Sequence, residues 1–126
     1  MIVVERKTVL VIEDDELNIK LVKEVLDMGG YDVLEALNGE TGLKMTRDFD
    51  PDIILLDINL PDMDGYTVAR KIQGELMKKD IPIIALTALA LPKDLENARE
   101  AGCVDCVTKP FRVQRLLDAI AKYVQD

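Results

Sequence analysis

The sequence predicts an α/β fold in which one parallel sheet of five strands is covered by helices on both faces. Short apolar runs typical of strands alternate five times with segments whose apolar residues recur at helical spacing. The connections between them are short, and strand–helix units joined in this way form a parallel sheet through right-handed crossovers. The 126 residues are enough for one domain with a buried core.

The third predicted strand, residues 53–57, is the most distinctive. Four consecutive large apolar side chains precede a carboxylate, Asp57. An unbroken apolar run of this kind is typical of a strand buried on both faces, as in a parallel sheet. We predict the other strands over residues 8–12, 31–36, 81–86 and 106–108. The second has weaker apolar character, so we expect it near an edge, and Pro82 is compatible only with the start of the fourth.

The predicted helices begin and end at residues typical of helix termini. These are Asp14 or Asp15 and then Gly29-Gly30 for the first helix, Asn38-Gly39 at the start of the second, and Pro92 and Gly102 for the fourth. The third is predicted over residues 66–78. The apolar residues expected on the buried faces are Leu17, Leu21, Val25 and Met28, then Leu43 and Met45, then Val68, Ile72 and Leu76, then Leu95 and Ala98, and last Val113, Leu116, Leu117, Ile120 and Val124. The methionines are expected to fill the core.

Composition excludes several classes of function. The chain has no histidine, which removes Ser-His-Asp triads, Cys-His pairs, His-ligated zinc and phosphohistidine carriers. A net charge of −8 argues against binding to nucleic acid or to an anionic membrane surface. No apolar run approaches the roughly 20 residues of a membrane span, and the expected location is the cytoplasm.

Two cysteines, Cys103 and Cys106, have the CxxC spacing. Two thiols alone make a poor metal site, and a redox pair sits at the start of a helix. This pair instead follows a predicted helix and leads into a strand. We therefore predict structural thiols.

Polar residues stand at the ends of four predicted strands: Glu13-Asp14, Asp57, Thr87 and Lys109. Asp57 alone could be a strand-end residue that caps the next turn. The carboxyl ends of parallel strands share one edge of the sheet, however, where ligands bind in such folds. Three carboxylates together would raise one another's pKa unless a cation neutralised them, and oxygen-only ligands favour Mg²⁺ before Ca²⁺. With an ammonium and a hydroxyl nearby, this set is typical of phosphoryl transfer.

Four segments with these residues make the chain similar to a known family: residues 11–15, 51–65 (PDIILLDINLPDMDG), 81–88 and 108–111. Over residues 8–124 the chain resembles the receiver domain of two-component response regulators, and in particular single-domain chemotaxis and polar cell-fate regulators. The resemblance implies a flavodoxin-like, doubly wound (βα)5 fold with strand order 2-1-3-4-5. It also implies a single receiver domain over residues 1–126 without an output domain.

The same resemblance implies roles for the site residues. Asp57 matches the phospho-acceptor. Glu13 and Asp14 match the acidic pair that holds Mg²⁺, for which Mn²⁺ can substitute, together with Asp57 and the main-chain carbonyl of Asn59. Lys109 matches the family's lysine, which precedes an expected cis bond to Pro110, and Thr87 matches the switch hydroxyl.

The chain departs from the family pattern at two positions. Glu13 replaces the commoner Asp but remains an oxygen ligand. Cys106 stands where the family has an aromatic switch residue, so the coupling must use the backbone between Leu89 and Pro92, or be weaker. Leu89 and Asn59 occupy positions that tune hydrolysis of the phosphoryl group in the family. Asp62 and Asp64 are expected to be solvated turn residues.

The resemblance implies a signalling switch rather than an enzyme that acts on other substrates. A histidine kinase or phosphotransfer protein would donate the phosphoryl group, and a downstream protein would bind the face made by the fourth helix, fifth strand and fifth helix. Two alternatives remain open. One is a degenerate receiver that serves as an unphosphorylated docking module. The other is a magnesium-dependent phosphatase with an Asp nucleophile, although that family has an Asp where this chain has Asn59.

Overall fold

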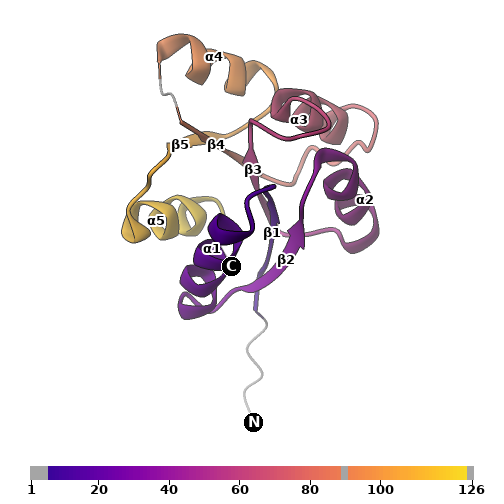
Figure 1. The fold of residues 1–126 in the computed structure, drawn as a ribbon. Helices are drawn as coiled ribbons and strands as arrows, with labels where there is room; N and C mark the ends of the chain where they lie inside the picture. The colour runs from indigo at the N-terminus through magenta and orange to yellow at the C-terminus, as the bar shows by residue number, and fades with distance from the viewer. Residues whose placement is uncertain (1–5, 89–90, 125–126) are drawn as a thin grey trace.

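The computed structural model describes residues 6–88 and 91–124, and they alternate strand and helix five times (Figure 1). The strands are β1 (Thr8–Ile12), β2 (Asp32–Ala36), β3 (Ile53–Asp57), β4 (Ile83–Thr87) and β5 (Asp105–Thr108). The helices are α1 (Glu16–Met28), α2 (Gly39–Phe49), α3 (Gly65–Gln73), α4 (Pro92–Glu100) and α5 (Val113–Tyr123).

All five strands pair in parallel, in the order β2-β1-β3-β4-β5. This confirms the predicted doubly wound sheet, with β2 at an edge. Helices α1 and α5 pack on one face, and α2, α3 and α4 lie on the other (Figure 1). Strands β1, β3 and β4 therefore lie inside the sheet, and β2 and β5 form its edges.

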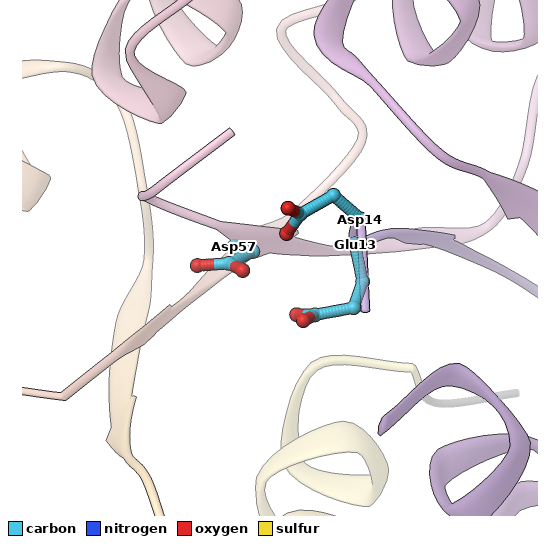
Figure 2. Close-up of side chains that lie close together, drawn as sticks. All are labelled: Glu13, Asp14 and Asp57. Atoms are coloured by element: carbon cyan, nitrogen blue, oxygen red, sulfur yellow. The ribbon is translucent and has the colours of Figure 1, made fainter. Parts of the chain in front are cut away.

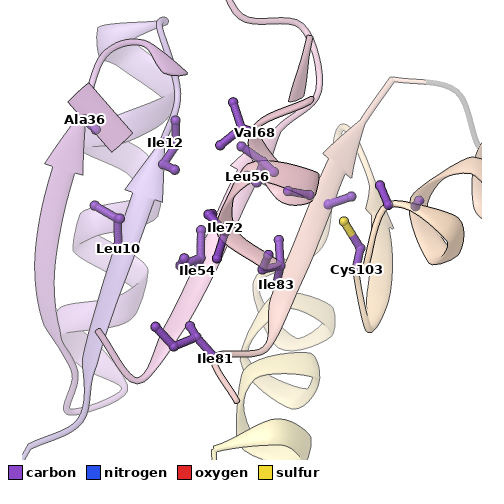
Figure 3. Packing of buried hydrophobic residues seen from close by; sticks show 14 residues of the cluster. Leu10, Ile12, Ala36, Ile54, Leu56, Val68, Ile72, Ile81, Ile83 and Cys103 are labelled. Carbon is purple, nitrogen blue, oxygen red and sulfur yellow. The ribbon is translucent and has the colours of Figure 1, made fainter. Parts of the chain in front are cut away.

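Side chains of β3 alternate between the two cores because successive residues of a strand point to opposite faces. Ile54 and Leu56 belong to the cluster shown in Figure 3, with residues of α3 such as Ile72. Ile53 and Leu55 face α1 and α5. Every residue of β3 is buried, including Asp57. The unbroken apolar run is thus explained by helices on both faces.

The predicted buried face of α1 is wrong. Leu17, Leu21 and Met28 are 78%, 54% and 83% exposed, and Val25 alone of the four is buried. The helix instead buries Ile19, Val22 and Leu26 against the sheet. These three have the same helical spacing, so the helix carries two apolar sets and can turn only one of them toward the sheet.

Smaller differences concern helix α3 and the methionines. The predicted third helix ends at Gln73, not at residue 78. Beyond Gly74 the amide of Leu76 bonds to the carbonyl of Lys71, five residues back, and Met77 takes a left-handed conformation, φ 54°. Met28 and Met77 are exposed rather than core residues, and Leu95 and Val113 are also exposed. Pro82 lies just before β4, where its carbonyl accepts a hydrogen bond from Ile54.

Candidate functional site

Four neighbouring strands carry the site residues to one edge of the sheet. Glu13 follows β1, Asp57 ends β3, Thr87 ends β4, and Lys109 follows β5. Chain positions as far apart as Glu13 and Lys109 therefore meet, as the sequence predicted.

Three carboxylates form the centre of the site. Glu13, Asp14 and Asp57 each offer an oxygen, and these oxygens lie within 4.8 Å of one another (Figure 2). Glu13 and Asp57 are only 2% and 4% exposed, whereas Asp14 is exposed. The cluster is thus anchored in the core and open to solvent on one side.

Lys109 bridges the two buried carboxylates. Its Nζ lies 2.8 Å from Oε2 of Glu13 and 3.2 Å from Oδ2 of Asp57. Burial acts to lower the pKa of Lys109, but the hydrogen bond that its ammonium donates to Glu13 and the charges of both carboxylates outweigh it, so the pKa is raised. Lys109 is therefore an ammonium ion at neutral pH.

One ammonium does not neutralise three carboxylates. Burial raises the pKa of Glu13, Asp57 raises it further, and Lys109 only partly opposes them. The site therefore carries an excess of negative charge on hard oxygen atoms. This donor set fits a divalent cation such as Mg²⁺, which prefers carboxylate, carbonyl and water oxygens.

Backbone and amide groups fix the orientation of the two buried carboxylates. The amide of Asn59 donates to Oδ1 of Asp57 at 3.0 Å. The side-chain Nδ2 of Asn18, on the first turn of α1, donates to Oε1 of Glu13 at 3.3 Å. The sequence analysis missed Asn18. Its position could have indicated this contact. Asn18 stands three residues after the helix cap Asp15, so its side chain lies on the first turn, near the end of β1.

Thr87 is 7% exposed and stands one residue beyond Leu86, the register partner of Asp57. Its carbonyl accepts a hydrogen bond of 2.7 Å from the amide of Lys109. The ends of β4 and β5 are thereby joined beside Asp57. The bond between Lys109 and Pro110 is cis, as the family resemblance implied.

Cys106 lies on β5 opposite Ala85 and is half-buried. Both cysteines are free thiols. Burial raises the pKa of Cys106, and it raises that of Cys103 to about 12. Neither group is therefore an activated thiolate, in agreement with the predicted structural thiols. Leu89 lies outside the described residues.

Three further aspartates near the site accept hydrogen bonds from backbone amides. Asp15 caps α1 and Asp64 caps α3. Asp62 is exposed, as predicted for a turn residue, yet its carboxylate reaches across to the start of α2, a contact that the sequence analysis missed.

This fold and this acidic edge define a class of single-sheet α/β domain with one site at the carboxyl ends of its strands. Residues 9–121 match the family model of the response regulator receiver domain, so the chain belongs to the response regulator receiver family.

Two relatives are similar to this chain over nearly its whole length. It is 37% identical over 120 residues to the polar-differentiation response regulator DivK of Brucella anthropi, covering 95% of this chain and 98% of that protein. A response regulator structure from Chloroflexus aurantiacus superposes with a TM-score of 0.90 at 31% identity, covering 95% and 98% of the two chains.

A third relative is a receiver domain described with a bound magnesium ion. It is the receiver domain of the sensor histidine kinase PA1611 from Pseudomonas aeruginosa, with a TM-score of 0.87, 32% identity and coverage of 95% and 98% of the two chains. Its structure is described as having a magnesium ion coordinated in the active site cleft.

Among the described residues of the present chain, no helix is long and apolar enough to cross a membrane.

Proposed function

We propose that this receiver is a phosphorylation-activated switch whose acceptor is Asp57. The observation that carries the proposal is the position of this carboxylate. It is buried at the carboxyl edge of the sheet, 3.2 Å from the Lys109 ammonium and grouped with two further carboxylates. The phosphoryl donor is a histidine kinase, a phosphotransfer protein or a small donor such as acetyl phosphate.

Glu13, Asp14, Asp57 and the main-chain carbonyl of Asn59 would hold Mg²⁺, and Mn²⁺ could take its place. The excess of negative charge on oxygen ligands supports this assignment, as does the magnesium described for the PA1611 receiver. When bound, the metal supplies positive charge that neutralises the transferring phosphoryl group.

In the proposed transfer, a carboxylate oxygen of Asp57 attacks phosphorus. The new bond between this oxygen and phosphorus makes the side chain an acyl phosphate. The bond between phosphorus and the donor's nitrogen or oxygen breaks, and its electron pair stays with the donor. Lys109 remains an ammonium throughout and pairs with a phosphoryl oxygen. The Thr87 hydroxyl, one strand away, donates a hydrogen bond to the same group. The chain catalyses its own modification and its reversal, and it turns over no other substrate.

The proposed output is a change in partner binding at the face made by α4, β5 and α5. Phosphorylation shifts a conformational equilibrium only by its different interaction free energy with the two states. The Lys109 ammonium would exchange its ion pair with Glu13 for one with the phosphoryl group, and Thr87 would move toward that group. These two changes would supply the difference in interaction free energy. Cys106 replaces the bulky switch residue, so the backbone after β4 carries the coupling. We also propose that residues 1–126 act as a single receiver domain in the cytoplasm.

Incubation with Mg²⁺ and acetyl phosphate tests the proposal. The intact mass should rise by one phosphoryl group, and Asp57→Asn should abolish the increase. Asp52→Asn is a matched control, because Asp52 is also a carboxylate that accepts a backbone hydrogen bond, from Thr8 at the opposite edge of the sheet. An unmodified mass for the folded wild-type chain would favour the docking module instead.

A further inference from the structure

Asp62 uses both carboxylate oxygens to hold the start of another element. Its Oδ1 accepts a hydrogen bond from the amide of Gly39 at 2.8 Å, and its Oδ2 accepts one from the amide of Glu40 at 2.9 Å. These are the first two amides of α2, which have no acceptor within their own helix. A residue of the loop 58–64 thus completes the cap of α2, whose two amides lie 23 and 22 positions earlier in the chain.

The helix does not cap these two amides itself. The side chain of Asn38 accepts from Thr41 at 2.8 Å, and the carbonyl of Asn38 accepts from Gly42 at 3.0 Å. The four initial amides are therefore divided between Asn38 and Asp62. Burial acts to raise the pKa of Asp62, but the amide hydrogen bonds outweigh it and the pKa is lowered, so the carboxylate is ionised at neutral pH.

Close packing supports the same contact. A Cβ at Gly39 would lie 2.6 Å from Cγ of Met63 and 2.9 Å from Cγ2 of Val68. A larger residue at Gly39 would force the side chain of Met63 or Val68 to shift. The loop is therefore fixed to α2 by packing at Met63 as well as by the carboxylate of Asp62.

The other end of this loop lies at the acidic cluster. The amide of Asn59 donates to Asp57, and Asn59 pairs with Asp64 through an antiparallel bridge. The amide of Gly65 also donates to the carbonyl of Ile58 at 2.9 Å. The loop is thus a closed turn. Asp62, three residues after Asn59, holds this turn against the start of α2.

We propose that Asp62 is a positioning residue for the metal site: it anchors the loop 58–64 to α2 and thereby holds the carbonyl of Asn59 where a cation can use it. The inference rests on the proposed function, because it assumes that Asn59 contributes to a metal site. Asp62 does not contact the metal and acts only through the loop.

Magnesium affinity tests the inference. Asp62→Ala should raise the Kd for Mg²⁺ about tenfold, the scale typical of residues that orient metal ligands. Asp62→Asn should raise it less, because the amide side chain keeps one acceptor oxygen. Asp52→Ala, which removes a comparable bond to Thr8 far from the site, should leave the Kd unchanged. Calorimetric titration measures all three variants.

Amide hydrogen exchange without metal provides a second readout. In Asp62→Ala the amides of Gly39, Glu40 and Asn59 should exchange faster, whereas those of Thr41 and Gly42, which Asn38 caps, should not change. Equal Kd values for wild type and Asp62→Ala would overturn the inference and leave the proposed function intact. Failure of the wild-type chain to bind Mg²⁺ would overturn the proposed function, and the inference with it.

Discussion

The ammonium of Lys109 is the positive charge that holds the two buried carboxylates of the site together. Its ammonium is shared by two carboxylates that are nearly inaccessible to solvent. Glu13, being one methylene longer than the family's usual Asp, reaches this ammonium at 2.8 Å while Asn18 holds its other oxygen. The metal-free site is therefore an ion-pair network as well as a candidate ligand set.

Lys109→Ala should reduce the rate of Asp57 phosphorylation by acetyl phosphate about 10²-fold, because the charge on the transferring group loses a preorganised partner. Mass spectrometry over time measures the rate. Lys78→Ala, which removes an exposed ion pair with Asp50, is the control and should react normally. A normal rate for Lys109→Ala would exclude an electrostatic role.

The raised pKa of Glu13 predicts a pH dependence of stability without metal. The folded chain binds a proton at Glu13 more tightly than the unfolded chain, whose pKa is near 4.5. This contribution to stability is therefore complete below pH 4.5 and is lost as the pH rises through the folded pKa. Urea unfolding of the metal-free chain should show a weaker loss over this range in Glu13→Gln, whose amide does not ionise. An identical slope in both proteins would contradict the assignment.

The positions of the site residues were predictable from sequence where they follow from position on a strand. Glu13, Asp57, Thr87 and Lys109 each stand at a strand end, and parallel strands must bring those ends together. The contact from Asp62 to the start of α2 could not be predicted, because it joins a loop to a helix whose separation depends on the packing of Gly39 against Met63.

Among the elements, the strands were the most predictable. In residues 53–56 every side chain is apolar because helices cover both faces of the sheet, and all four are buried. Helix α1 was predicted in its extent but not in its orientation. It has one apolar set at Leu17 and Leu21 and another at Ile19, Val22 and Leu26, and spacing alone does not tell which set meets the sheet.

Two leucines of α1 test that orientation. Leu26→Ala should reduce the free energy of unfolding by about 2–5 kcal/mol, because Leu26 is fully buried and its loss leaves a cavity. Leu17→Ala should change it by less than about 0.5 kcal/mol, because Leu17 is 78% exposed. Denaturant unfolding compares the two variants. Similar losses would mean that the helix is rotated.

For the molecule as a whole, a cation at the proposed metal site would link ligand binding to folding. The proposed ligands come from the residues after β1, from β3 and from the loop after β3, so they assemble only in the folded chain. A ligand that binds only the folded state stabilises it by about 2.7 kcal/mol at a concentration 100 times its Kd.

Mg²⁺ should therefore raise the melting temperature of the wild-type chain, and a chelator should reverse the increase. Asp14→Asn should lose most of this stabilisation, because it removes an exposed ligand without disturbing the buried pair. Glu16→Gln, also near the start of α1, should retain it. A melting temperature that does not depend on Mg²⁺ would contradict the proposed metal site.

The bridge between Glu13 and Lys109 spans 96 positions of the chain. During synthesis, the first carboxylate leaves the ribosome long before the lysine that pairs with it. A nascent chain that has not yet released β5 has no completed pocket, so the proposed phosphorylation of Asp57 must wait until Lys109 has left the ribosome.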